Sequence, residues 1–380
     1  MAQTYFIDDE PALVERLDAF LAKLRTSLEQ APFASELVVL LLGGGYGRGE
    51  GGVYRGPEVA GALLYNDLEF YVVTRGLRGP KELKAWCHHW EKAGHEEIGI
   101  EVEFKILAAA ALQQAQPSMF YYDLLLGHKV VWGDDGFCEG LAASLRDARL
   151  IPLVEVTRLL FNRGSGLLFS RERLRTSDSE IDSSFIERNH AKAKLALGDA
   201  VLALNERYDW SCQNRATRLG EALPLVPPDW EALKKWHVEG VAFKLHPRHE
   251  FPGKVALLER QSELTQAWLR TFLWLESIRL KRTLPDPLAY VSEPARLFPD
   301  TPLLKNLALR VRDQLRTGSR LPAPFDYPRA ALQRALVLLL GSQESDRASW
   351  QKASVLVGLH PTSDSTQVMQ AYRNWWNRYN

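Results

Sequence analysis

The 380-residue sequence predicts an α+β N-terminal domain over residues 1–150, with a mixed sheet and flanking helices, followed by an all-α C-terminal domain over residues 151–380. Two observations lead to this prediction. Up to about residue 150, short β-rich segments alternate with segments of helical periodicity. Beyond Pro152, long helical patterns follow one another and strand signals nearly vanish.

The first domain is predicted to begin with a helix over Glu10–Gln30, because its leucines and Phe20 fall on one helical face. Glu36–Leu42 reads ELVVLLL, which is typical of a buried strand, and it ends abruptly at glycine. Two further strands are predicted, at Leu68–Thr74 and at Ile98–Leu107, and the latter alternates apolar and acidic residues. The other predicted segments are a glycine-rich loop, three helices and a short strand or turn: Gly43–Gly61, Lys81–Ala93, Ala108–Gln116, Phe120–Leu126 and Lys129–Trp132.

The second domain is predicted from helical patterns alone, each with apolar residues at helical spacing. The predicted helices are Val154–Phe169, Phe185–Tyr208, Trp230–Glu239, Glu259–Arg282, Pro302–Thr317, Tyr327–Leu340 and Thr366–Tyr379. The last of them is rich in tryptophan. At helical spacing, this favours a docked C-terminal helix over a platform that stacks bases.

The composition excludes several classes of protein. Lys plus Arg and Asp plus Glu are both 47, so the chain is neutral and lacks the cationic field of a protein that coats nucleic acid. The three cysteines, Cys87, Cys138 and Cys212, form no C-x-x-C pair, which argues against a disulfide framework and a cysteine zinc site. No secretory signal and no apolar stretch of membrane-spanning length is found, so we expect a cytoplasmic protein without a membrane partner.

Seven glycines lie within residues 43–52, directly after the strand predicted to end at Leu42. A strand followed by glycines is typical of places where backbone approaches a phosphate. A Walker A loop is excluded because Gly49 is followed by Glu50 and not by Lys-Ser or Lys-Thr. A dinucleotide fingerprint would have to open a helix, whereas the sequence continues VYRGP. A kinase loop would need downstream HRD and DFG motifs, and neither exists.

Acidic residues recur at spacing two on the next two predicted strands. Asp67 and Glu69 therefore face the same way, and so do Glu101 and Glu103. Carboxylates this close repel one another unless a cation lies between them, and hard oxygen ligands suit Mg²⁺. Three carboxylates beside a glycine loop could hold two Mg²⁺ ions and the phosphates of a nucleotide. An Asp-x-Glu pair alone is more often a solvated sheet face, and the glycine loop is what favours a site.

These features resemble the nucleotidyltransferase superfamily of the DNA polymerase β type. Its signature is an apolar strand, Gly-Gly or Gly-Ser, a spacer, Asp-x-Asp or Asp-x-Glu on the next strand, and a third acid. GGYGRGEG at residues 44–51 looks like the extended loop of the minimal bacterial members, and HKVVWGD at 128–134 is similar to the segment that closes their catalytic domain. The resemblance covers roughly residues 10–135. The spacer from Gly45 to Asp67 is longer than the superfamily norm.

The resemblance implies a metal-dependent transfer of a nucleoside monophosphate from an NTP to a hydroxyl-type acceptor, with release of pyrophosphate. It implies two Mg²⁺ ions, with Mn²⁺ as a substitute, and ATP as the expected nucleotide. Asp67 and Glu69 would bind both metals. The third acid would be Glu101, which we favour, or Glu103, which stays open. It would bind the metal that activates the acceptor and could act as its base.

The resemblance also implies phosphate contacts. Backbone N–H groups of Gly44 and Gly45 would approach the β- and γ-phosphates, and Arg48 would either add a charge-assisted contact or anchor the loop. On the predicted helix Ile186–Tyr208, Lys192 would contact the triphosphate, with Lys194 as the second choice. Both lysines could equally be ordinary surface residues of an amphipathic helix.

Three alternatives remain open from the sequence. The domain could bind nucleotide without catalysis, as a sensor or regulator. The helical half could serve as an interaction scaffold. The acceptor could be a small molecule, a protein or RNA, and the neutral charge favours a small molecule or protein over nucleic acid.

Overall fold

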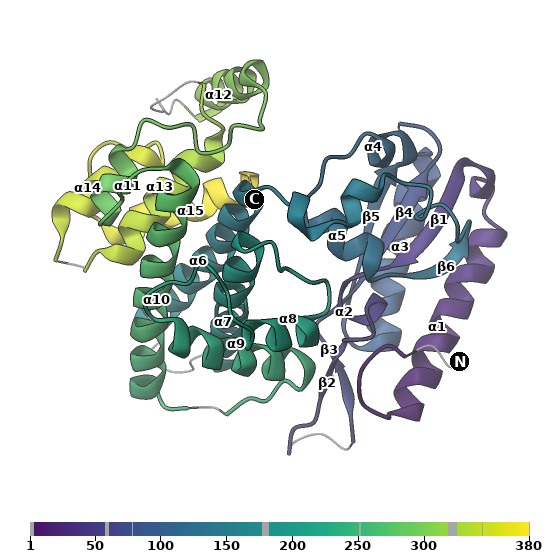
Figure 1. Cartoon of the computed structure of the whole chain (residues 1–380). Coiled ribbons are helices and arrows are strands. Elements are labelled where there is room, and N and C mark those ends of the chain that lie inside the picture. The colour runs from purple at the N-terminus through teal and green to yellow at the C-terminus, as the bar shows by residue number, and fades with distance from the viewer. Residues whose placement is uncertain are drawn as a thin grey trace. The chain divides into compact units, whose positions relative to one another are not determined.

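The computed structural model describes residues 4–57, 61–77, 79–176, 182–250, 252–317, 325–343 and 345–379. Part of the predicted glycine-rich loop, residues 58–60, lies outside them. The coarse prediction is confirmed, because an α+β region with a small mixed sheet occupies the N-terminal part and helices make up the C-terminal part (Figure 1).

The chain divides into two compact units that differ from the predicted division at residue 150. The first unit comprises Met1–Pro152, Asn205–Pro224 and Lys234–Glu250. The second comprises Leu153–Leu204, Leu225–Leu233 and Phe251–Asn380. The chain thus leaves the first unit close to the predicted boundary but returns to it twice, so residues 151–380 are not one continuous unit.

The first unit is built on a four-stranded mixed sheet in the order β5-β4-β1-β6. Strand β1 (Leu37–Leu42) is antiparallel to β4 (Asp67–Thr74) and to β6 (Lys129–Gly133). Strand β5 (Glu101–Ala108) lies at the edge and is parallel to β4. A separate two-stranded sheet pairs β2 (Gly52–Tyr54) with β3 (Leu63–Tyr65), inside the region predicted as a loop and spacer.

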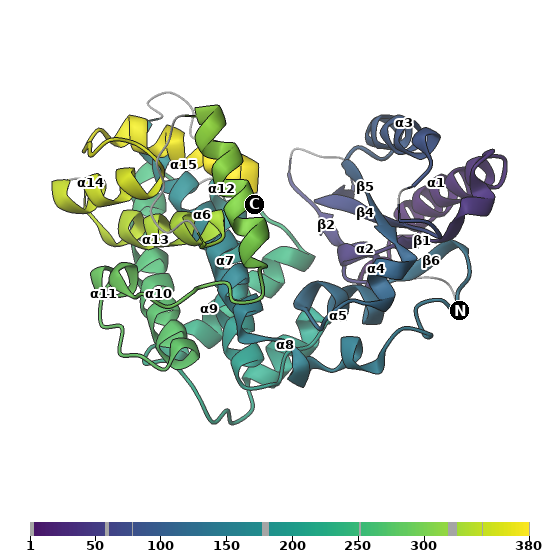
Figure 2. The ribbon, with the colours of Figure 1, turned by 90° about the horizontal axis from the view of Figure 1, so that it is seen from above.

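Helices cover both faces of this sheet (Figure 2). Strand β4 sends Phe70 and Val72 into one core with α1 (Pro11–Glu29) and α3 (Lys81–Ile98). It sends Tyr71 and Val73 into a second core on the face of α4 (Ala109–Gln113) and α5 (Met119–Leu126). All six residues of β1 are buried because both faces above it are covered, as its unbroken apolar run predicted.

The first unit is completed by helices from further along the chain. Helix α8 (Cys212–Leu219) was not predicted. Helix α9 (Trp230–Leu245) starts at its predicted residue, and its part from Lys234 onward belongs to the first unit. Ser211 caps α8, since its side chain accepts a hydrogen bond from the backbone N–H of Asn214. The remaining short elements are a one-turn helix α2 and three 3-10 helices: Gly44–Gly47, Ala34–Glu36, Ala143–Arg146 and Ala148–Leu150.

The described residues of the second unit form helices and connecting loops, with no strand among them. Helix α6 (Leu153–Thr176) packs against α7 (Ser183–Leu204) and α10 (Lys254–Leu280). Trp268 is fully buried between these helices, and its indole N–H donates to the carbonyl of Leu160 at 3.0 Å. Its other helices are α11 (Pro287–Ser292), α12 (Leu303–Thr317), α13 (Pro328–Gly341), α14 (Arg347–Leu356) and α15 (Ser365–Tyr379).

The tryptophan-rich C-terminal segment forms the docked helix α15. The Tyr372 hydroxyl lies 2.7 Å from the Ser165 hydroxyl of α6, and the Trp376 ring lies 5.3 Å from that of Phe161. In the described part of the chain, no helix has both the length and the apolar character needed to cross a bilayer.

Candidate functional site

The glycine loop, which we define as Gly43–Gly52, starts where β1 ends beside β4. The backbone N–H of Gly43 donates to the carbonyl of Glu69 at 2.8 Å, so the pairing of the two strands continues into the loop. Gly44 has a left-handed φ of 60°, and a Cβ there would lie 3.0 Å from Oε2 of Glu69. Glycine at this position therefore lets the loop backbone pass directly beside a predicted metal ligand.

Three carboxylates converge next to this loop. In the parallel pairing of β4 with β5, Asp67 lies opposite Glu101 and Glu69 lies opposite Glu103. One oxygen each from Asp67, Glu69 and Glu103 lies within 4.8 Å of the others, and all three residues are partly buried. We call these three residues the acid cluster. They come from one inner and one edge strand, and together they could hold a metal ion.

The acid cluster is bordered by two donors that the sequence interpretation missed. Nζ of Lys105 lies 3.2 Å from Oε1 of Glu69 and 3.4 Å from Oε2 of Glu103. Burial lowers the pKa of Lys105, but the two carboxylates outweigh it and raise the pKa above its usual value. The Tyr71 hydroxyl donates to Oε2 of Glu69 at 3.1 Å. Burial, and then the charge of Glu69, raises the pKa of Tyr71, which keeps this hydroxyl protonated.

The acid cluster suits Mg²⁺ by its chemistry. All three ligands are carboxylate oxygens, which this ion prefers, and Gly44 leaves no side chain in front of Glu69. The ammonium group of Lys105 lies against two of the three residues and offsets part of their negative charge.

Glu101, the residue favoured as the third acid, is not a member of the acid cluster. It is exposed near the start of β5, whereas Glu103 is partly buried. An open groove of about 650 Å³ lies between α3 and β5, and both Glu101 and Glu103 line it. The geometry therefore brings Glu103 together with Asp67 and Glu69, and leaves Glu101 at the groove.

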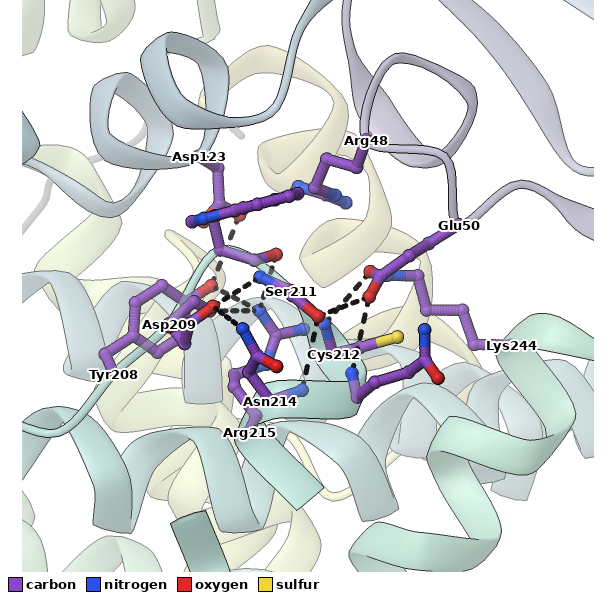
Figure 3. A network of polar contacts seen from close by, with 12 residues as sticks. Arg48, Glu50, Asp123, Tyr208, Asp209, Ser211, Cys212, Asn214, Arg215 and Lys244 are labelled. Carbon is purple, nitrogen blue, oxygen red and sulfur yellow. Dashed lines mark hydrogen bonds and ion pairs between the residues drawn. The ribbon is translucent and has the colours of Figure 1, made fainter. Parts of the chain in front are cut away.

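Arg48 takes the position of a loop anchor. Its side chain is only 13% exposed, and Nη1 lies 3.1 Å from Oδ2 of Asp123 on α5 (Figure 3). The Tyr208 hydroxyl donates to the same carboxylate oxygen at 3.2 Å. Gly127 is needed here because a Cβ would come within 2.2 Å of the Arg48 side chain. A contact of Arg48 with nucleotide stays a prediction.

Glu50 at the far side of the loop is also buried, with 3% exposure. The hydroxyl of Ser211 donates to its Oε1 at 2.6 Å, and the backbone N–H of Cys212 donates to its Oε2 at 2.9 Å (Figure 3). Burial alone would raise the pKa of Glu50, but the charge of Lys244 and these hydrogen bonds lower it to about 2. Glu50 is therefore an anion at neutral pH, and it ties the loop to α8.

The predicted phosphate contacts are distributed over both units. Gly44 and Gly45 lie in α2, directly beside the acid cluster in the first unit. Lys192 and Lys194 lie on α7 in the second unit, and both are partly buried. Their contact with a triphosphate stays a prediction.

Of the residues that the sequence interpretation missed, Lys105 has a local sequence signal and the contact of Ser211 with Glu50 has none. Lys105 follows Glu103 at spacing two, so strand alternation places it on the acid face and could have identified it. Ser211 is a recognisable N-cap residue before a short helix. Its contact with Glu50, however, joins residues 161 positions apart, and no local pattern encodes such a pair.

No protein-family model matches the chain, and no curated protein matches it.

Proposed function

We propose that the chain is a metal-dependent nucleotidyltransferase that moves a nucleoside monophosphate from an NTP to a hydroxyl group of an acceptor. The observation that carries the proposal is the convergence of Asp67, Glu69 and Glu103 beside a glycine loop that leaves β1 at the same end of the sheet. A glycine loop alone or an acidic sheet face alone would be far less specific.

In the proposed reaction, the acceptor oxygen attacks the α-phosphorus of the NTP. The new bond joins that oxygen to phosphorus, the bond from phosphorus to the β-phosphate oxygen breaks, and pyrophosphate leaves. Bound Mg²⁺, for which Mn²⁺ could substitute, would neutralise charge on the entering and leaving oxygens. Asp67 and Glu69 on β4 would hold it, and Glu103 would complete the set and take the proton of the acceptor hydroxyl.

The glycine loop would bind the β- and γ-phosphates. The N–H groups of Gly44 and Gly45 lie in the first turn of α2, where a helix offers them no internal acceptor. ATP is the proposed nucleotide. A small molecule or a protein is the proposed acceptor class, because the chain has no net positive charge for nucleic acid.

The proposal predicts that Asp67→Asn combined with Glu69→Gln abolishes metal-dependent release of pyrophosphate from an NTP. The double variant keeps the size of both side chains but removes two of the three negative charges that would hold the metal. Pyrophosphate release with ATP, GTP, CTP and UTP, each with and without Mg²⁺, measures the effect. A loss of at least a hundredfold is expected, with the far-ultraviolet circular dichroism spectrum unchanged.

The matched control is Glu82→Gln combined with Glu96→Gln, which removes two exposed carboxylates of α3. It should release pyrophosphate at the wild-type rate. Turnover that persists in the Asp67/Glu69 variant would rule out this assignment of the site.

A second candidate function is nucleotide binding without catalysis, as in a regulator. It is favoured by Lys105, whose ammonium group already offsets charge at Glu69 and Glu103. A rise in melting temperature with ATP and Mg²⁺ but no release of pyrophosphate would select this function over catalysis.

A further inference from the structure

Backbone hydrogen bonds hold the glycine loop in place. Each backbone N–H group from Gly47 to Gly51 donates to a backbone carbonyl. The N–H groups of residues 47 to 50 donate within the loop, to Gly43, Gly44, Tyr46 and Gly45 respectively. The N–H of Gly51 donates to Tyr5, outside the loop. Among them, the N–H of Glu50 donates to Gly45 at 2.8 Å. A Cβ at Gly45 would in turn lie 3.1 Å from the carbonyl oxygen of Glu50. The position of Glu50 therefore sets the position of Gly45.

Glu50 is itself held by a segment from much later in the chain. Its two carboxylate oxygens accept from the Ser211 hydroxyl and from the N–H of Cys212, at the N-terminus of α8. Nζ of Lys244 on α9 lies 3.7 Å from Oε2. An anion is favoured at this place because both the helix terminus and the ammonium group carry positive charge. All of these groups belong to the first unit.

We propose that Glu50 is a positioning residue that holds the glycine loop in its phosphate-binding conformation by docking its carboxylate onto the N-terminus of α8. Glu50 touches no substrate in this role and acts through Gly45. The inference rests on the proposed function only for the identity of the loop's ligand, an NTP. It adds that α8 fixes the conformation of the loop. This helix belongs to the first unit, although it follows Leu153–Leu204 of the second unit in the sequence.

The first test is hydrogen exchange, followed by mass spectrometry on the full-length protein without nucleotide. Glu50→Gln keeps the shape of the side chain but removes the charge. We expect amides in residues 43–52 to exchange at least tenfold faster, with exchange in α1 and β1 unchanged. Ser211→Ala, which removes one donor, should give a smaller increase in the same residues. It also keeps the test decisive if the Glu50 variant fails to fold.

The matched control is Glu97→Gln, which removes a carboxylate of α3 that pairs with Lys23 at 2.9 Å in the same unit. It should leave exchange in the glycine loop as in the wild type. Unchanged loop exchange in both the Glu50 and the Ser211 variants would overturn the proposal. An equal acceleration over the whole chain would also overturn it, because Glu50 would then only stabilise the fold.

The second test separates loop positioning from metal binding. With Mg²⁺ present, Glu50→Gln should raise the dissociation constant of ATP at least tenfold. The dissociation constant of Mn²⁺ measured without nucleotide should stay within twofold of the wild type. Faster loop exchange with unchanged ATP affinity would overturn the proposal. If the wild-type protein binds no ATP, the proposed function is wrong. If hydrogen exchange in the loop is unchanged in the variants, the positioning role of Glu50 is wrong.

Discussion

At the residue scale, Lys105 provides the acid cluster with a cation from the protein itself. Its ammonium group contacts Glu69 and Glu103 at 3.2 and 3.4 Å, which are two of the three residues that could hold a metal. A metal ion that bound there would meet a cluster whose negative charge is already partly neutralised. Lys105 would therefore lower the affinity of the acid cluster for a divalent cation, and it relieves the repulsion between the carboxylates.

This role predicts that Lys105→Met tightens the binding of Mn²⁺ in the absence of nucleotide. We expect the dissociation constant to fall by about tenfold, which corresponds to ~1.4 kcal/mol. Isothermal titration calorimetry measures it directly. Lys23→Met, which removes the ammonium group that pairs with Glu97 on α3, is the control and should leave the constant unchanged. Weaker or equal Mn²⁺ binding in Lys105→Met would contradict the role.

The acid cluster also shows what a sequence can and cannot predict about single residues. Strand alternation predicted that Asp67 and Glu69 share a face, because this rule depends only on neighbouring residues. The third acid depends on the register between β4 and β5, which places Glu101 opposite Asp67 and Glu103 opposite Glu69, and on the side-chain positions, which bring an oxygen of Glu103 within 4.8 Å of both carboxylates. That register follows from the packing of the whole sheet and of the crossover helix α3, so local pattern could not decide it.

At the element scale, elements with a clear apolar pattern were predicted, whereas β3 and α8 were not. The predicted helix Glu10–Gln30 is Pro11–Glu29 in the structure. Strand β3 has only three residues, and α8 has eight, with the charged Arg215 among its buried positions. Such short elements carry no readable periodicity and are stabilised by their partners in space. For this reason the sequence did not predict α8, the helix that holds Glu50.

The contact between α7 and α10 makes stability depend on pH. His190 is 5% exposed, and its Nε2 lies 2.8 Å from Oε1 of Gln261, to which it donates. Burial lowers the pKa of His190 to about 4. Above the ordinary pKa near 6.5, the imidazole is neutral in both states and costs nothing. Below it, the unfolded chain takes up a proton that the folded chain does not, so stability is lost as pH falls from about 6.5 to 4.

We therefore expect the free energy of unfolding to fall by up to about 3 kcal/mol between pH 7 and pH 4 through this group alone. Urea titrations at several pH values measure the slope. His190→Asn should be less stable at pH 7 because it disturbs a buried contact, but its stability should change less with pH over this window. His88→Asn, at an exposed position of α3, should keep the wild-type slope. An equal slope in the His190 variant would contradict the assignment.

At the scale of the whole molecule, the first unit is formed by three separate segments of the chain and not by one continuous segment. The change in character near Pro152 predicted where the first unit is left. The return of Asn205–Pro224 and Lys234–Glu250 depends on contacts between residues far apart in sequence, such as Glu50 with Ser211. No composition or periodicity marks a helix as belonging to an earlier unit, and so the sequence could not predict this part of the architecture.

This organisation predicts that residues 1–152 do not form a stable native unit by themselves. In this fragment the carboxylate of Glu50 would lack its donors Ser211 and Cys212. Asp123, the partner of Arg48, would lack the hydroxyl of Tyr208. We expect a fragment of residues 1–152 to show poor dispersion in a ¹H–¹⁵N correlation spectrum and rapid proteolysis. The same fragment joined by a flexible Gly-Ser linker to residues 205–250 should give a dispersed spectrum. A well-folded short fragment would contradict the prediction.

The route of the chain also has a consequence for how the protein is made. When Pro152 leaves the ribosome, all four strands of the sheet have been synthesised, but the helix that receives Glu50 has not. Roughly 90 residues separate Pro152 from Lys244, which at ~5–20 residues per second is about 5–20 s of further translation. During that interval the glycine loop lacks the contacts of Glu50 with α8 and α9. Chaperone contact with the growing chain is expected to be concentrated in this window.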